Sequence, residues 1–234
     1  MPPSETLAGW TERDGLLAES RLSALRHGFT TRRLGNMADP ESRARLRARG
    51  IPEPLTLKQV HGTAIHEAAA DRAGADGDGW LVTKPGFVAA VYVADCVPLF
   101  LWSDDLSLAG VFHAGWRGTA QGMAKAAVAA FAARGVPAAR LSAALGPHAG
   151  ACCYRVGPEL RKDFPESSFV RRGGALHLDL AAENRRQLAA AGVPAENLGA
   201  PAPCTVCGPD YFSYRRDQRG ARMFAVLSLD RWPS

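Results

Sequence analysis

Three side chains that can bind a soft metal ion stand at the ends of expected strands. They are His61 in Lys-Gln-Val-His-Gly, Cys96 in Ala-Asp-Cys-Val-Pro and His113 in Phe-His-Ala-Gly-Trp-Arg-Gly. Strand ends next to glycine or proline loops are where a scaffold presents side chains to a cleft. Two imidazoles and a thiolate suit Zn²⁺, and three protein ligands leave the fourth position for water or substrate. The set therefore predicts a catalytic metal site.

Spacing alone leaves other interpretations of these residues open. None of the three belongs to a close ligand pair, and buried histidines and cysteines are often ordinary core residues. Two histidines and a cysteine are also the equatorial set of blue copper, although a laccase needs many more histidines than the six in this chain. Cys96 activated by His113 would instead be the nucleophile of a cysteine hydrolase. Asp95, next to Cys96, should point to the opposite face and meet backbone or an arginine.

An anion site is expected next to His113. Gly115-Trp-Arg-Gly-Thr119 places Arg117 and free backbone N–H groups at the start of a helix, which suits inorganic phosphate. The alternative is that the glycines only permit a tight turn between strand and helix. Arg32 and Lys58 are further possible phosphate partners, and Asn36 is a possible substrate contact.

The remaining cysteines are expected to be reduced thiols. Five cysteines with an adjacent pair do not resemble a secreted disulfide framework, which indicates a reducing compartment. Cys204 and Cys207 form a Cys-x-x-Cys pair that could indicate a second zinc, but no other close ligand pair completes it, so structural thiols are favoured. Cys152 and Cys153 are expected to line the pocket, with Tyr154 placed to stack on a base.

Composition predicts a globular protein with a sizeable core and one domain over residues 1–234. Hydrophobic residues make up 47% and charged residues 22% of the 234 positions. The net charge of +5 comes from dispersed arginines without interleaved aromatics, so nucleic-acid binding is not expected. The longest apolar run, 87–102, contains Asp95 and Pro98 and is shorter than a membrane span of about 20 residues. Residues 1–20 lack the pattern of a signal peptide, so a cytoplasmic protein is expected.

The elements that must position these residues follow from periodicity and from turn and cap signals. The clearest unit is a strand over 108–113 and a helix over 119–134 that Thr119 caps. The other expected helices cover 39–49, 158–164 and 179–191. The other expected strands cover 55–67, 88–102, 141–145, 176–178 and two segments within 211–229. Helices and strands mix without a regular βαβ period, which favours the α+β class over a doubly wound sheet.

Five motifs together resemble the YfiH family, also described as the laccase-domain or multicopper polyphenol oxidase family. They occur in order between about Phe29 and Leu229. They are Lys58-Gln-Val-His-Gly62, Ala94-Asp-Cys-Val-Pro98, His113-Ala-Gly-Trp-Arg-Gly118, Leu145-Gly-Pro with Cys152-Cys-Tyr-Arg-Val-Gly157, and Phe212-Ser-Tyr-Arg-Arg-Asp217.

The resemblance implies a zinc bound by His61, Cys96 and His113 and a layered α/β/β/α fold with mixed sheets. It implies purine nucleosides and inorganic phosphate as partners, with phosphorolysis of adenosine, inosine and methylthioadenosine and a side activity as adenosine deaminase. Editing of peptidoglycan precursors and copper-dependent polyphenol oxidation are the alternatives. The segment from Phe29 to Asn36 is shorter than the family pattern, which affects the expected substrate range more than metal binding.

Overall fold

Two five-stranded sheets form the centre of the protein. The structure is a computed structural model and describes residues 9–200, 202–218 and 220–232. The first sheet is antiparallel, in the order β1-β2-β3-β12-β6. The second has the order β4-β5-β8-β7-β9, and only its β4–β5 pair is parallel.

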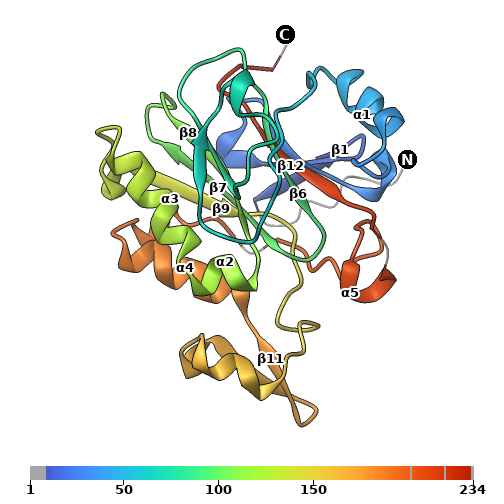
Figure 1. Cartoon of the computed structure of the whole chain (residues 1–234), viewed down its shortest axis with the longest axis vertical. Coiled ribbons are helices and arrows are strands. Elements are labelled where there is room, and N and C mark those ends of the chain that lie inside the picture. Colours follow the sequence, from blue (N-terminus) through green and yellow to red (C-terminus); the bar gives the residue numbers. More distant parts are fainter. Residues whose placement is uncertain (1–8, 201, 219, 233–234) are drawn as a thin grey trace.

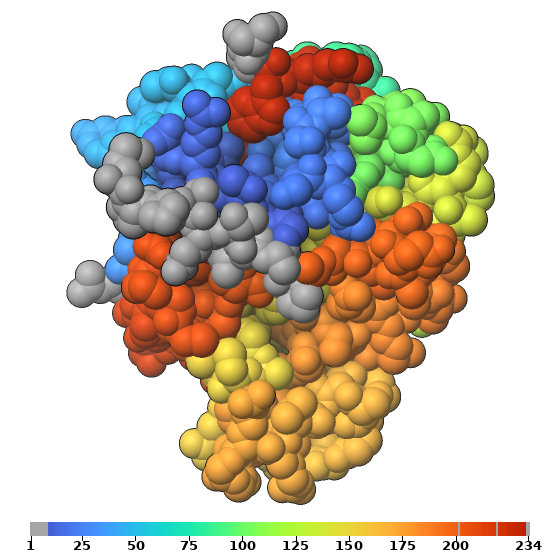
Figure 2. Space-filling model, turned by 180° about the vertical axis from the view of Figure 1, so that it is seen from behind, coloured from blue at the N-terminus to red at the C-terminus, as the bar shows by residue number. Residues whose placement is uncertain are grey.

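The strands are short and mostly buried. Those of the first sheet are β1 (Trp10–Arg13), β2 (Leu16–Glu19), β3 (His27–Thr30), β6 (Ala89–Val93) and β12 (Met223–Leu227). Those of the second are β4 (Ile65–Glu67), β5 (Gly79–Val82), β7 (Val97–Ser103), β8 (Ala109–Ala114) and β9 (Leu141–Leu145). A separate hairpin is formed by β10 (Phe169–Arg172) and β11 (Ala175–Leu178). This hairpin belongs to a lobe that extends from the lower end of the molecule (Figures 1 and 2).

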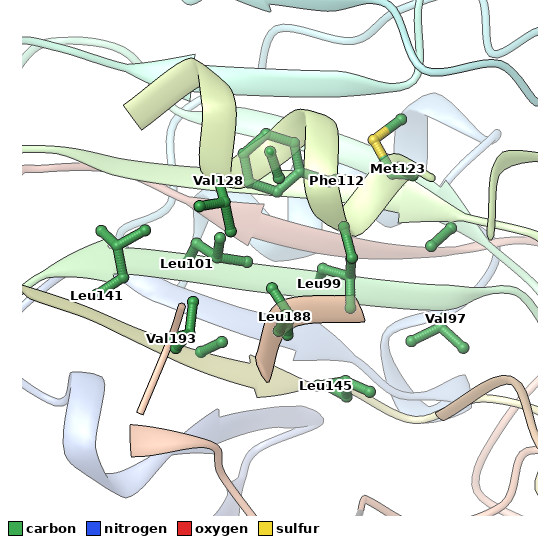
Figure 3. Packing of buried hydrophobic residues seen from close by; sticks show 14 of the residues in the cluster. Val97, Leu99, Leu101, Phe112, Met123, Val128, Leu141, Leu145, Leu188 and Val193 are labelled. Atoms are coloured by element: carbon green, nitrogen blue, oxygen red, sulfur yellow. The ribbon is translucent and has the colours of Figure 1, made fainter. Parts of the chain in front are cut away.

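Helices cover the outer faces of the sheets (Figure 1). The α-helices of the described chain are α1 (Pro40–Arg47), α2 (Trp116–Ala120), α3 (Met123–Ala132), α4 (Leu180–Ala190) and α5 (Tyr214–Asp217). Apolar side chains fill the space between the sheets, including Phe100. Leu101 of β7 packs with Val128 of α3 on the other face of the second sheet (Figure 3). Leu46 of α1 packs with Phe224 on the outer face of the first sheet. The expected layered α/β/β/α arrangement with mixed sheets, of the α+β class, is confirmed.

The helix expected over 119–134 is divided in two. Gly122 adopts a left-handed conformation with φ 88°, which ends α2 and starts α3. The first of these helices already begins at Trp116, with Gly115 at its N-cap, so the expectation that Thr119 caps a helix is wrong. The Thr119 hydroxyl instead accepts a hydrogen bond from the Asn184 side chain of α4.

Other boundaries also differ from the expectation. Residues 158–162 form a 3₁₀ turn in place of the expected helix. Within 211–229 the first expected strand is wrong, because the Ser213 side chain caps the short helix α5 there. Within 55–67 only β4 is a strand, while Leu55 and Lys58 form isolated bridges. The helix that begins after Asp179 is confirmed, and the Asp179 side chain accepts the Ala182 N–H.

The run 88–102 is a strand pair whose members belong to different sheets. β6 lies in the first sheet and β7 in the second, so residues 94–96 carry the chain across from one sheet to the other. Cys96 therefore lies where the two sheets meet. Within the part of the chain that the structure describes, no helix is both long and apolar enough to cross a membrane.

Candidate metal centre

His61, Cys96 and His113, here called the triad, come together from three separate segments. His61 precedes β4, Cys96 precedes β7, and His113 lies in β8, paired in register with Pro98. One ligand atom of each residue lies within 4.8 Å of the others, and the two imidazole rings are 5.0 Å apart. His61 is exposed, whereas His113 is 3% exposed. Such a set has the donors and the open side of a three-ligand zinc site.

Asp78, which no motif in the sequence indicated, supports the triad from its buried side. Its carboxylate is fully buried, and its Oδ1 accepts a hydrogen bond from Nδ1 of His113 at 2.8 Å. The backbone N–H of His113 also donates to the Asp78 carbonyl at 2.7 Å. Because Nδ1 is occupied, Nε2 of His113 is the nitrogen left for a metal. The only signal in the sequence is an acidic residue between two glycines just before a buried strand.

The same carboxylate fixes the loop that carries His61. The backbone N–H groups of Val60, His61 and Gly62 donate to Asp78 at 3.1, 3.0 and 2.8 Å. His61 adopts φ 61°, a left-handed conformation that is rare outside glycine and clusters at functional sites. Successive N–H groups around such a residue form a concave anion site, and here the anion is the Asp78 carboxylate. The side chain of Gln59 pairs with the backbone of Tyr92 at 2.6 and 2.9 Å, which holds the loop against β6.

Glycines at 115 and 118 allow α2 to approach the triad. A Cβ at position 115 would lie 3.0 Å from the Cys96 sulfur and 3.2 Å from Cδ2 of His61. A Cβ at position 118 would lie 3.0 Å from the Gly62 carbonyl oxygen. The glycines of this motif are therefore required for close packing against the ligands, in addition to any role in the turn.

Charges within the triad favour the thiolate form of Cys96. Burial by itself raises the pKa of this thiol, but the neighbouring His113 and His61 outweigh that effect and lower it to about 6. Burial likewise lowers the pKa of His113, but Cys96 and Asp78 raise it to about 9. A thiolate is the form of cysteine that binds metal.

Asp95 bonds to the chain around residues 205–215 instead of joining the triad. Its carboxylate accepts hydrogen bonds from the hydroxyls of Thr205 and Ser213 at 2.6 and 3.0 Å and from the Arg215 N–H at 2.7 Å. Its backbone has φ 83°, and its carbonyl accepts the Ala149 N–H. The expectation that Asp95 meets backbone is confirmed. These bonds attach two distant loops to the segment that carries Cys96.

The triad opens into a cavity of about 760 Å³. Its lining residues include three arginines and one carboxylate, that of Asp95, so positive charge predominates. Each guanidinium stacks on an aromatic ring that also lines the cavity. The pairs are Arg117 with Trp116 at 4.3 Å, Arg215 with Tyr154 at 4.6 Å and Arg222 with Tyr214 at 5.7 Å. The cavity thus combines ligands for a metal, positive charge for an anion and flat surfaces for a ring.

The proposed phosphate and substrate residues fall in different places. Arg117 lines the cavity with the triad. Arg32 and Asn36 line a neighbouring cavity of about 370 Å³, where Arg32 pairs with Asp217 at 2.6 Å. Asn36 Oδ1 accepts the backbone N–H groups of residues 38 and 222, so it shapes the cavity wall. Lys58 is exposed and pairs with Asp76 at 3.1 Å.

The cysteines outside the triad form a cluster of their own. The sulfurs of Cys152, Cys153, Cys204 and Cys207 lie within 4.8 Å of one another. The expectation that no second ligand pair accompanies Cys204 and Cys207 is therefore wrong, because the fold brings Cys152 and Cys153 next to them from a distant part of the sequence. Cys152 and Cys153 are not among the residues that line the triad's cavity, whereas Tyr154 is.

The other histidines bond to nearby backbone groups. His66 bonds to the Asp76 carbonyl, His148 to the Gly146 carbonyl and His177 to the Ala151 carbonyl. His27 is buried and bonds to backbone on both sides of its ring.

Comparison with known proteins assigns the chain to a family. A family model described as multi-copper polyphenol oxidoreductase laccase matches residues 8–230. The chain belongs to this laccase-like family. The resemblance to the YfiH family is confirmed as well, since similar proteins and solved structures carry the names YfiH and YlmD.

Two relatives and one solved structure illustrate the similarity of this laccase-like chain to known proteins. The purine nucleoside phosphorylase of Deinococcus radiodurans is 34% identical over 233 residues, which cover 89% of this chain and 90% of that protein. An adenosine deaminase from an unknown prokaryotic organism is 40% identical over 162 residues, 65% of this chain and 61% of that protein. The crystal structure of YlmD from Geobacillus stearothermophilus matches with a TM-score of 0.86 at 28% identity and covers 97% of this chain and 100% of that one.

Proposed function

We propose that this chain is a zinc-dependent purine nucleoside phosphorylase with adenosine deaminase as a side activity, working as one unit over residues 1–234. The observation that carries the proposal is the triad at the wall of a cavity that also holds three arginine–aromatic pairs. The names of the relatives from Deinococcus radiodurans and from the unknown prokaryote support the two activities.

The donor set of the triad fits zinc. Two imidazoles and a thiolate whose pKa is lowered are soft and borderline ligands, and the Asp78–His113 hydrogen bond is the usual support of a metal-binding histidine. A bound zinc would supply a Lewis acid that polarises a substrate oxygen or lowers the pKa of water toward ~7. His61, Cys96 and His113 are the residues that would hold it.

Inorganic phosphate would bind to the arginines of the cavity. Arg117, Arg215 and Arg222 supply guanidinium groups, which suit phosphate oxygens because their N–H donors can bond in pairs. In phosphorolysis a phosphate oxygen attacks C1′ of the ribose while the bond from C1′ to the purine nitrogen breaks. The products are ribose 1-phosphate and the free base. Arg32 and Asn36 line the neighbouring cavity and Lys58 is exposed, so none of the three would contact the phosphate directly.

The purine would lie against the aromatic side chains of the cavity. Burial raises the pKa of Tyr154 to about 12, so its hydroxyl stays protonated and can donate a hydrogen bond to a purine nitrogen. Trp116 and Tyr214 offer further ring surfaces, and Tyr214 is 58% exposed at the mouth. Stacking on such rings favours a planar base over a linear substrate.

The test measures metal content and products together. Protein purified without added metal is assayed with adenosine over a range of phosphate concentrations, and ribose 1-phosphate and inosine are quantified separately. We expect phosphate-dependent ribose 1-phosphate, and loss of both products in His61→Ala, Cys96→Ala and His113→Ala. A variant such as Cys96→Ala that keeps full turnover would remove the triad from the mechanism. Absence of any nucleoside turnover by the zinc-loaded wild type would reject the phosphorylase.

Copper-dependent polyphenol oxidation is the second candidate, because the family description names it and the donor set also suits copper. It would be favoured if copper-loaded protein oxidised phenols at a rate that the zinc-loaded protein did not approach, and if the rate fell in Cys96→Ala. Equal oxidation by free copper ions would exclude it.

A further inference from the structure

The four-cysteine cluster, defined as Cys152, Cys153, Cys204 and Cys207, lies outside the cavity chemistry described above. Its first pair follows β9 in the loop 146–157, and its second pair precedes α5. All four are free thiols, and their sulfurs lie within 4.8 Å of one another. Figure 2 shows the yellow segment near residue 150 next to the red-orange segment near residue 205. Four convergent thiols are the composition of a closed structural zinc site.

The spacing of the sulfurs fits one tetrahedral ion. A zinc–sulfur bond of about 2.3 Å in a regular tetrahedron places neighbouring sulfurs about 3.8 Å apart. The sulfurs of Cys152 and Cys207 are 3.6 Å apart, and none of the pairs in the cluster exceeds 4.8 Å. A disulfide would need sulfurs about 2.05 Å apart. The observed spacing therefore matches shared coordination better than a covalent bond.

The Cys-x-x-Cys loop is already shaped for a metal. The Gly150 N–H donates to the Cys204 sulfur at 3.3 Å. A backbone N–H group directed at the first sulfur stabilises the negative charge that a ligand thiolate carries. The Gly208 N–H closes the turn by donating to the Cys204 carbonyl at 2.9 Å. The loop thus holds its first sulfur in place before an ion arrives.

Arg216 rigidifies this loop. Its guanidinium donates to the carbonyls of Thr205, Val206 and Gly208 at 3.0 to 3.1 Å. A soft-ligand set such as these four thiols selects zinc or another thiophilic ion over magnesium or calcium.

We propose that the four-cysteine cluster is a structural zinc site, separate from the triad. All four positions of the ion would be filled by protein sulfur, so it would carry no substrate. It would join two loops that each reach the triad's cavity. Tyr154 follows Cys153 directly, while Thr205, next to Cys204, donates to Asp95. The ion would thereby fix one wall of the cavity.

Zinc X-ray absorption together with elemental analysis tests the proposal on the intact wild-type chain, purified under reducing conditions without added metal. We expect two zinc ions per chain. One would have four sulfur neighbours from the cluster, and the other would have a single sulfur neighbour, that of Cys96. One zinc with four sulfur neighbours would support the cluster and overturn the triad's zinc. One zinc with a single sulfur neighbour would support the triad and overturn the cluster.

Matched variants then assign each ion. His61→Ala with His113→Ala should retain one zinc with four sulfurs at about 2.3 Å. Cys204→Ser with Cys207→Ser should lose one zinc and keep the other with a single sulfur neighbour. If the serine variant does not fold, thiol titration of folded wild type decides: cluster thiols that react only after chelation support the site. Thiols that react at once, or a disulfide found in the reduced preparation, would overturn it.

Discussion

Asp78→Asn replaces one carboxylate oxygen with an NH₂ group and removes the negative charge at nearly constant shape. The substitution therefore tests the role of the buried carboxylate itself. Oδ1 accepts hydrogen bonds from His61 and His113, and Oδ2 accepts those of Val60 and Gly62, at 2.8 to 3.1 Å. Asparagine keeps one acceptor oxygen and places an NH₂ group where the other oxygen was. Two donors therefore lose their acceptor, whichever way the amide is oriented.

The expected effect is large for one substitution. Each hydrogen bond to a charged group contributes about 1.5 to 3 kcal/mol, so two lost bonds would lower the free energy of unfolding by about 3 to 6 kcal/mol. The loop 60–62 is near the surface, where water can replace a lost partner, so about 3 kcal/mol is expected. Loss of the carboxylate partner of His113 should also weaken zinc binding by about 10- to 100-fold.

Two measurements check this expectation. Urea unfolding of the metal-free protein gives the stability, and the buffered free-zinc concentration that restores half of the nucleoside turnover gives the affinity. Asp76→Asn is the control, because that carboxylate is 63% exposed and forms a surface ion pair with Lys58, so its effect should stay below about 0.5 kcal/mol. Asp78→Asn with the stability and zinc requirement of the control would refute the role assigned to the carboxylate.

Three further outcomes are expected. Gly115→Ala should lower the zinc content, because its Cβ would lie 3.0 Å from the Cys96 sulfur. Gly220→Ala is the control, because the described residues place no atom within 4 Å of its added Cβ. Elemental analysis compares the zinc content of the two variants. Arg117→Ala should raise the KM for phosphate about tenfold or more, since a charge-assisted hydrogen bond contributes about 1.5 to 3 kcal/mol, while Lys58→Ala should leave it unchanged. Equal effects of these two variants would contradict the assignment. In the metal-free protein, alkylation of Cys96 followed by peptide mapping should slow only as pH falls through about 6, because the imidazoles outweigh burial and lower its pKa; a midpoint near ~8.5, the ordinary thiol value, would contradict this.

The sequence predicted the members of the triad but not Asp78, the residue that supports them. His61, Cys96 and His113 could be named because each stands in a motif at a strand end. Asp78 could not, because its contact with His113 spans 35 residues and depends on the pairing of β5 with β8. The pairing of two strands that are far apart in the sequence depends on how the whole sheet assembles, so no local pattern around Asp78 indicates its partner.

The layered fold was predicted, but its polar and short elements were not. The strands β1 and β2 have four residues each, too few to show a period. The helix break at Gly122 was missed because the apolar spacing that predicted the helix begins at Met123, after the break, and so says nothing about the residues before it. The sequence showed each cysteine pair, but only the fold shows that the two pairs meet.

The triad and the cavity wall lie on different kinds of segment, which has a consequence for engineering. The triad stands on segments at the ends of strands, while much of the cavity wall comes from loop residues such as Ala38, Tyr154 and Tyr214. Wall loops of different length could therefore be exchanged among relatives without moving a ligand. A library that varies Ala38 and Tyr214, with the triad, Asp78 and the cavity arginines held constant, would therefore test how the wall controls the nucleosides accepted under the proposed function.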